Sequence, residues 1–198
     1  PETKLAAEAG LEIGKTRGIK VNHNYQTSDP DIYAVGDAVE SYDALRHCPG
    51  RLALAGPAQR QARAAADHIY GIPHNNRGYI GSSCIRVFSQ NAAATGLNEK
   101  LAQAAGYSYD SVLIFPTDKV GIMPDSHYMA FKLVFEVPTG RILGAQAVGQ
   151  GAVDKRIDVL ATAIRAGMTA LELTELDLAY APPYSSAKDP VNMAGFMI

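Results

Sequence analysis

Apolar and polar residues alternate over residues 128–137, and this alternation predicts a β-strand with one buried face. The apolar positions are Met129, Phe131, Leu133 and Phe135. A period of two is typical of a half-buried antiparallel strand. The sequence Pro138-Thr139-Gly140 then predicts a turn into a second strand over residues 142–148. Two shorter runs predict further strands over residues 83–88 and 112–115.

Apolar residues at helical spacing predict helices beside these strands. Residues 52–70 form one such segment, whose apolar face consists of Ala58, Ala62, Ala65 and Ile69. A second amphipathic helix ends at Gly167 and would bury Val153, Ile157, Leu160, Ala161 and Ile164. Thr169 and Glu172 follow with the spacing of a capping box, which predicts another helix start. The second half of the chain therefore reads as a sheet with helices on one side.

An uninterrupted apolar run, residues 32–35, predicts a strand of a different kind. It lies between the Asp29-Pro30 turn and Gly36, a pattern that favours a strand buried on both faces. Gly36 allows another backbone or a ligand to approach, and Asp37 would place a carboxylate just past the strand's carboxyl end, where open α/β sheets bind ligands. The alternative is an ordinary turn from a strand into a loop.

The longer segment TSDPDIYAVGDA, residues 27–38, resembles the second FAD motif of the flavin-dependent pyridine nucleotide-disulfide oxidoreductases. That motif consists of a threonine, a spacer, a few apolar residues and Gly-Asp, and GIKVN at residues 18–22 precedes it at the usual distance. The resemblance implies that Asp37 accepts a hydrogen bond from a hydroxyl of the FAD ribityl chain. It also implies that Thr27 and Gly36 belong to the cofactor-binding motif.

The start of the helix within residues 52–70 is a second candidate cofactor contact. Pro57 suits a first helical turn, and Gly56 leaves room beside the unpaired backbone donors. A helix start carries about half a positive charge and favours an anion in front of it. The resemblance implies that Ala55, Gly56, Pro57 and Ala58 face the pyrimidine end of the flavin, where negative charge accumulates on reduction. The alternative is a plain surface helix.

Turn-forming residues at 71–78, GIPHNNRG, predict a boundary between two domains. With the family resemblance, residues 1–77 are expected to be part of an FAD/NAD-binding domain and residues 78–198 a carboxy-terminal dimerisation domain. The expected fold class is α/β plus α+β, in which the remnant of a parallel-sheet domain precedes an antiparallel sheet with helices on one side. The resemblance places the first FAD motif, the redox cysteine and the NAD site in sequence before Pro1.

Residues 178–196, LAYAPPYSSAKDPVNMAGF, contain prolines that forbid a long helix and predict an extended, ordered arm. The arm resembles the terminus of coenzyme A-disulfide reductases and their NADH oxidase-like relatives, which reaches across a homodimer to the partner's flavin. The resemblance implies that Tyr180 lies beside the partner's flavin, and that Lys188 and Gln59 contact a coenzyme A-type substrate. The alternative is that Tyr180 and Tyr184 pack in an interface.

One departure from these relatives leaves the electron acceptor open. Many of them carry a tyrosine pair in a Gly-Tyr-Tyr-Pro-Gly segment, whereas this chain has GIMPD at residues 121–125. A persulfide, a polysulfide or oxygen is therefore an alternative to coenzyme A disulfide. The chain also lacks the His-Pro-Thr motif of the glutathione reductase and lipoamide dehydrogenase branch.

Composition excludes several other classes of protein. The formal charge is −2, and the 18 lysines and arginines are scattered, so no nucleic-acid partner is expected. The longest apolar stretches are too short to span a bilayer, and we expect no membrane partner and a cytoplasmic location. Cys48 and Cys84 form no CxxC pair. Cys84 is expected to be a packed thiol, with a thiol enzyme as the alternative, and no metal site is expected.

The sequence thus favours the carboxy-terminal portion of an FAD-dependent NAD(P)H oxidoreductase that reduces a disulfide or persulfide such as coenzyme A disulfide. One alternative is a non-catalytic dimerisation module, and another is an NADH oxidase or peroxidase that acts on oxygen species. The 198-residue chain alone is expected to be inactive and to bind neither FAD nor NAD(P)H stably.

Overall fold

The computed structural model describes all residues from Pro1 to Ile198, and the chain divides into two compact units, Pro1–Tyr79 and Ile80–Ile198. The helices and strands of the first unit are α1 (Lys4–Glu8), β1 (Ile19–Lys20), the 3-10 helix η1 (Gly36–Ala38), β2 (Val39–Asp43), β3 (Cys48–Gly50) and α2 (Ala55–Ile69). None of the helices in the structure combines the length and the apolar character that crossing a membrane requires.

The first unit contains a small mixed sheet in the order β1-β2-β3. Strand β1 pairs with β2 in parallel, and β2 pairs with β3 antiparallel. A separate apolar cluster forms where α2 packs on the preceding loop, with Tyr25, Ala64 and Ala65 buried and Val21 and Tyr33 against them. This cluster fixes α2 to the segment that precedes η1.

The prediction of a buried strand over residues 32–35 is wrong. The segment is extended, but its only ladder contact is an isolated bridge between Gln26 and Tyr33. Ile32 and Val35 are each 38% exposed, because no strand pairs along either side of them. The regular strand β2 follows the Gly-Asp turn instead of preceding it.

The expected apolar face of α2 is also wrong in part. Ala65 is buried as expected and Ala58 is half-buried, but Ala62 and Ile69 are exposed. The buried side of the helix consists of Gln61, Ala64 and Ala65. Since alanines occur on several sides of this helix, the spacing of apolar residues does not distinguish a buried side from an exposed one. The contact with Tyr25 decides which side is buried.

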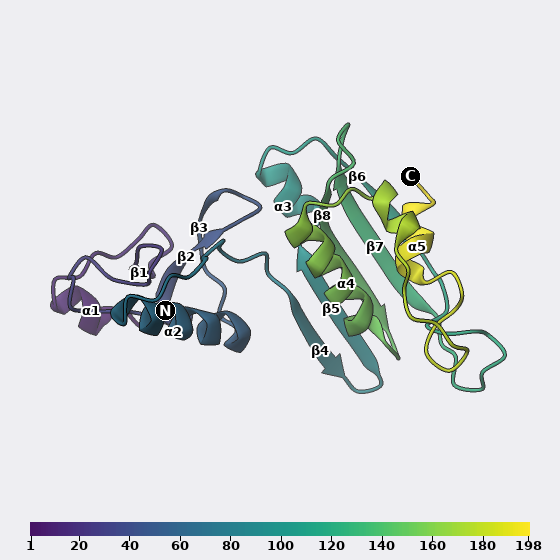
Figure 1. Cartoon of the computed structure of the whole chain (residues 1–198), viewed down its shortest axis with the longest axis horizontal. Coiled ribbons are helices and arrows are strands. Elements are labelled where there is room, and N and C mark those ends of the chain that lie inside the picture. Colours follow the sequence, from purple (N-terminus) through teal and green to yellow (C-terminus); the bar gives the residue numbers. More distant parts are fainter. The chain divides into compact units, whose positions relative to one another are not determined.

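The second unit is a five-stranded sheet in the order β4-β5-β8-β7-β6, and every neighbouring pair is antiparallel. Its elements are β4 (Ser83–Val87), β5 (Gln90–Gly96), α3 (Glu99–Ala104), β6 (Tyr109–Ile114), β7 (Met129–Glu136), β8 (Ile142–Gly149), α4 (Val153–Ala166), the 3-10 helix η2 (Leu171–Glu175) and α5 (Pro190–Gly195). In Figure 1, α4 and α5 lie over the same face of this sheet. The expected fold class is confirmed.

The core of the second unit lies between α4 and the sheet. Thr95, Ala145 and Leu133 stand opposite one another on the three neighbouring strands β5, β8 and β7, and all three are fully buried. Leu160 of α4 is fully buried as well. Because Ala145 is small, its position leaves room for the larger side chains on either side of it.

The strands predicted in this unit are present, although the one expected over residues 112–115 spans Tyr109–Ile114. Helix α4 ends at Gly167, whose φ of 74° suits a residue without a side chain. Cys84 is exposed and therefore not a packed thiol, since β4 is an edge strand whose five residues are all exposed. The expected extended arm reaches only to Asp189, because Asp189 at the N-cap and Pro190 in the first turn begin α5.

Candidate functional site

The Gly36-Asp37 pair forms the start of η1, between the extended segment and β2. Gly36 has a φ of 84°, and a β-carbon placed there would meet no atom within 4 Å. Glycine is therefore required by the left-handed backbone, while the space beside it is open. The Asp37 side chain is exposed on this turn, and its carboxylate makes no ion pair within the structure.

Two side-chain contacts fasten this turn to α2. The Gly36 backbone N–H donates to Oε1 of Gln61 over 2.6 Å, and Nε2 of Gln61 donates to Oγ of Ser41 over 3.3 Å. Just before the turn, the Tyr33 hydroxyl lies 2.7 Å from Nδ1 of His68, and the two rings pack at a tilt. The turn that carries Asp37 is therefore held at a fixed place beside α2.

Gln61 is a functional candidate that the sequence did not reveal. It is only 4% exposed, although glutamine usually lies at the surface. Its burial is explained by its two hydrogen bonds, because a buried amide without partners would be costly. In the sequence, Gln61 lies one helical turn before Ala65, on the same side of the helix. That position gives no reason to expect a contact with Gly36.

The first turn of α2 offers unpaired backbone donors. Leu54 occupies the N-cap position, and no side chain caps the helix there. Ala55 and Gly56 are exposed, whereas Pro57 and Ala58 are half-buried. The N–H groups at such a helix start, together with the helix dipole, favour an anionic group in front of them. Gln59 is exposed in the next positions of the same helix.

Thr27 makes a local turn. Its hydroxyl donates to the Asp29 carbonyl over 3.1 Å and lies 3.2 Å from the Asp29 N–H, which donates to it. The residue also lines a shallow hollow of about 280 Å³ together with Glu12, Lys20, Val21, Asn22, Gln26 and Ser28. Thr27 thus shapes the Asp29-Pro30 turn, and its role toward a cofactor stays a prediction.

The remaining predicted residues lie in the second unit. Tyr180 is 49% exposed in the arm, and Lys188 is exposed at its end. The Lys188 ammonium lies 4.9 Å from the centroid of the Phe196 ring, a cation–π contact that sets the direction of the lysine side chain. Ser186 Oγ donates to the Lys188 carbonyl over 2.8 Å and closes the turn that carries it. Phe196 was not a candidate from the sequence.

The structure therefore assembles two sets of candidates. In the first unit, Gly36 and Asp37 lie beside α2, whose first turns carry residues 55–59. In the second unit, Tyr180 and Lys188 lie on one arm. Within the structure, His, Cys, Asp and Glu side chains form no group of three or more that could hold a metal ion.

The residues of the first set fit a bound FAD. An exposed carboxylate without a partner can accept a hydrogen bond from a polyol hydroxyl, and uncapped backbone N–H groups can donate to a ring edge that becomes anionic. The open space beside Gly36 would allow a ligand to approach the backbone.

Two family models match this chain. The model for the pyridine nucleotide-disulphide oxidoreductase dimerisation domain matches residues 83–190, and a pyridine nucleotide-disulphide oxidoreductase model matches residues 1–62. Because the first model covers more than half of the chain, the chain belongs to the pyridine nucleotide-disulphide oxidoreductase family. Its five-stranded antiparallel sheet lies within the residues that this model matches.

Individual proteins of known name are also similar to this chain. The chain is 32% identical over 197 residues to the coenzyme A disulfide reductase of Staphylococcus epidermidis, and the match covers 99% of this chain and 44% of that protein. Reduced Bacillus anthracis CoADR-RHD has a TM-score of 0.96 and 46% identity, and the NAD-dependent persulfide reductase from A. fulgidus has 0.95 and 42%. Each structural match covers the whole of this chain and 36% of the other. The chain thus spans less than half the length of these relatives.

Proposed function

We propose that this chain is the carboxy-terminal portion of an FAD-dependent NAD(P)H oxidoreductase that reduces a disulfide or persulfide. The observation that carries the proposal is the exposed, unpaired Asp37 carboxylate on a Gly36 turn that is fastened to α2. A carboxylate without a protein partner, held beside helix α2, is suited to bind a hydroxyl-bearing cofactor, and the start of the same helix is uncapped.

The residues of this chain would orient the cofactor. Asp37 would accept a hydrogen bond from a hydroxyl of the FAD ribityl chain, and Thr27 would support the turn before it. The backbone of Ala55, Gly56, Pro57 and Ala58 would favour the reduced, anionic ring through the positive end of α2. When bound, the flavin would supply the redox chemistry, by taking hydride from NAD(P)H and delivering electrons toward sulfur.

The relatives support a sulfur-containing acceptor. One is named as a coenzyme A disulfide reductase and another as a persulfide reductase, at 32% and 42% identity. Lys188 would provide a point charge for a phosphate of a coenzyme A-type substrate, Gln59 would contact the same substrate, and Tyr180 would border the flavin of a partner subunit. Oxygen as the acceptor stays the alternative to a disulfide or persulfide.

The proposal extends to the assembly and the setting of the protein. We propose a homodimer through the second unit, which matches the dimerisation-domain model, and a partial FAD/NAD-binding role for the first. Both cysteines are free thiols, which supports a reducing compartment such as the cytoplasm. If the chain acted only as a dimerisation module, Asp37 would have no ligand to hold.

The Asp37→Ala variant of the full-length protein tests the proposal. A hydrogen bond to a charged acceptor contributes enough that its loss should weaken FAD binding by about tenfold or more. Flavin content after purification, read from the visible absorbance, measures this loss. Asp31→Ala is the matched control, since Asp31 is an exposed aspartate six residues earlier.

Equal flavin content in Asp37→Ala, Asp31→Ala and the unchanged protein would overturn the assignment of Asp37. A second measurement concerns the 198 residues alone. The resemblance places the other FAD motif outside them, so we expect this chain by itself to be colourless and without turnover. A yellow chain with stoichiometric FAD would contradict that expectation.

A further inference from the structure

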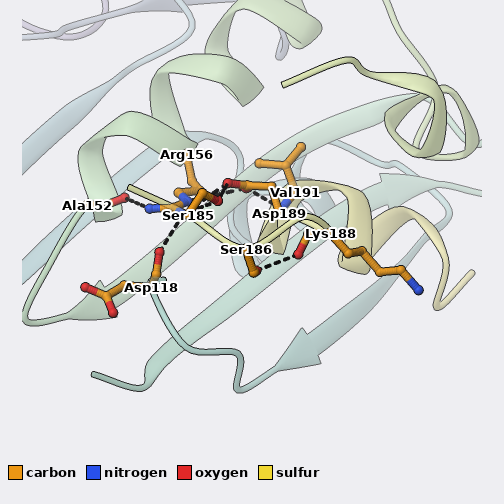
Figure 2. A network of polar contacts seen from close by, with 8 residues as sticks. All are labelled: Asp118, Ala152, Arg156, Ser185, Ser186, Lys188, Asp189 and Val191. Atoms are coloured by element: carbon orange, nitrogen blue, oxygen red, sulfur yellow. Dashed lines mark hydrogen bonds and ion pairs between the residues drawn. The ribbon is translucent and has the colours of Figure 1, made fainter. Parts of the chain in front are cut away.

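Arg156 is the largest fully buried side chain of the protein. It lies in the first turns of α4, and Figure 2 shows its guanidinium group among three segments that are far apart in sequence. Nη2 donates to the Asp118 carbonyl over 2.8 Å and to Ser185 Oγ over 3.0 Å. The same nitrogen lies 3.0 Å from Oδ2 of Asp189, and Nη1 donates to the Ala152 carbonyl over 3.0 Å.

The other members of this cluster are also buried and fully engaged. Ser185 Oγ donates to Oδ2 of Asp189 over 2.5 Å, and Oδ1 of Asp189 accepts from the N–H of Val191 in the first turn of α5. Ser185 is 1% exposed and Asp189 is 3% exposed. One carboxylate therefore neutralises Arg156 and caps a helix at the same time.

Two surface loops meet at this cluster. The first is the segment of residues 116–128, which Asp118 closes by exchanging hydrogen bonds with the His127 backbone over 2.9 and 2.8 Å. The second is the arm, residues 177–189. The Val120 N–H donates to the Ser185 carbonyl over 3.2 Å, so the two loops also touch directly.

The outward sides of both loops carry exposed side chains. Ile122 in the first loop is 84% exposed, and Tyr184 in the arm is 71% exposed. In Figure 2 the Lys188 side chain extends away from the buried cluster. A single buried arginine thus fixes the inner side of two loops whose outer sides are free to meet a ligand.

We propose that Arg156 is a positioning residue that holds the 116–128 loop and the arm against each other as one substrate-facing surface. The proposal rests on the proposed function, since it assigns the arm to a thiol or disulfide substrate. Arginine suits this task because its planar fork donates in several fixed directions, whereas lysine offers one mobile ammonium group. Ser185 and Asp189 serve as the acceptors that define its orientation.

The test uses Arg156→Lys in the full-length flavoprotein. Lysine keeps the buried charge beside Asp189 but cannot reach the Asp118 carbonyl and Ser185 at once. We expect the KM for the disulfide substrate to rise by about tenfold or more, because small displacements of positioning groups are costly. The KM for NAD(P)H and the visible flavin spectrum should stay unchanged. Hydrogen exchange of the Val120 amide should become faster by about tenfold or more, because an amide exchanges only when its hydrogen bond opens and a looser loop opens more often.

Two further variants keep the test decisive if Arg156→Lys folds poorly. Ser185→Ala leaves the ion pair in place and should change Val120 exchange and the disulfide KM in the same direction, to a smaller extent. Asp158→Asn is the matched control, because Asp158 lies exposed on the same helix and should alter neither readout. Exchange of the amides in β7, which pairs with a strand on each side, reports whether the fold is intact.

The outcomes separate this inference from the proposed function. Unchanged Val120 exchange in both Arg156→Lys and Ser185→Ala would overturn the anchoring role, whatever the enzyme does. Faster exchange with an unchanged disulfide KM would overturn the substrate-facing role of the two loops. Faster exchange in a protein that reduces no disulfide or persulfide at all would support the anchor and overturn the proposed function.

Discussion

Gln61 and Arg156 act in the same way on different loops: each is a buried polar side chain that reaches out of a helix to hold a backbone segment. Gln61 accepts from the Gly36 N–H, and Arg156 donates to the Asp118 carbonyl. An exposed candidate residue lies next to each contact. Asp37 follows Gly36, and Lys188 precedes Asp189, which also binds Arg156. In the proposed function, each such contact would position a ligand-binding side chain without touching the ligand itself.

The role of Gln61 can be measured by removing its carbonyl. Gln61→Leu keeps the side-chain size but leaves the Gly36 N–H without its acceptor, and an unsatisfied buried donor costs about 1–3 kcal/mol. We expect the free energy of unfolding, from urea titrations followed by circular dichroism, to fall by that amount. Gln59→Leu, at an exposed position of the same helix, should change it by less than about 0.5 kcal/mol. Equal losses in the two variants would show that the hydrogen bond from Gly36 to Gln61 does not stabilise the fold.

The Phe196 ring determines where the Lys188 ammonium points. Since an exposed cation–π contact is weak, Phe196→Leu should raise the KM for a coenzyme A-type disulfide by only about two- to fivefold. Stability should not change. Met197→Leu is the control, because Met197 is exposed beside Phe196 and lies outside the contact with Lys188. An effect of the same size in Met197→Leu would assign the change to the chain end in general.

The sequence was informative for exposed candidates and silent about buried partners, for a physical reason. A Gly-Asp turn and a proline-bordered arm are local features, so neighbouring residues reveal them. The contact between Gln61 and Gly36 joins positions 25 residues apart, and that between Arg156 and Asp118 joins positions 38 apart. Only packing brings such groups together, and glutamine or arginine in a helix ordinarily indicates a solvated face.

At the scale of elements, prediction succeeded where the two sides of a segment differ strongly. β7 carries large apolar residues on one side and Lys132 and Glu136 on the other, and both its type and its buried face are confirmed. α2 is rich in alanine on several sides, so its spacing did not identify the buried face. The apolar run at residues 32–35 failed as a strand because it has no pairing partners, a property that its own residues do not encode.

The capping box at the start of η2 makes a pH-dependent contribution to stability. Oε2 of Glu172 accepts from the Thr169 N–H over 2.7 Å and from the Thr169 hydroxyl over 2.8 Å. The backbone hydrogen bond first, and then the hydroxyl, lower the pKa of Glu172 below its ordinary value of 4.5. Because the folded state holds the proton less tightly than the unfolded state, this contribution is complete above pH 4.5 and is lost as pH falls through the lowered pKa.

Glu172→Gln isolates this effect, since glutamine also serves in a capping box but does not titrate. We expect the free energy of unfolding to fall less steeply between pH 5 and pH 3 in Glu172→Gln than in the unchanged protein, by urea titration. The pKa values of Glu99 and Asp125 are also lowered, by Lys132 and Lys119 respectively, and these groups contribute the same slope to both proteins. Identical slopes would mean that Glu172 is not coupled to folding.

At the scale of the whole molecule, the candidates for cofactor binding and those for substrate contact lie in different units of one chain. Asp37 and the start of α2 belong to Pro1–Tyr79, while Tyr180 and Lys188 belong to Ile80–Ile198. In the proposed homodimer, each flavin site would be completed by the arm of the partner subunit. A symmetric dimer would then contain two such composite sites, each built from both subunits.

Composite sites can be recognised by mixing two defective subunits of the full-length protein. Asp37→Ala, assayed at an FAD concentration below its raised dissociation constant, should leave most sites without flavin but keep the arm intact. Tyr180→Ala with Lys188→Ala should keep the flavin but impair the arm. In a mixed dimer, one site combines the intact flavin of one subunit with the intact arm of the other. Since random pairing makes half of the dimers mixed, and each has one intact site of two, disulfide reductase activity should recover to about a quarter of normal.

The deciding comparison is between the disulfide reductase activity of the mixture and the activities of the two variants measured separately. Each variant alone should be nearly inactive, and the recovery should require unfolding and refolding, or coexpression, so that subunits exchange. Activity that never exceeds the mean of the two separate variants would place Tyr180 and Lys188 at the flavin of their own subunit. It would leave Asp37 as a flavin contact, because the loss of flavin in Asp37→Ala is scored independently by visible absorbance.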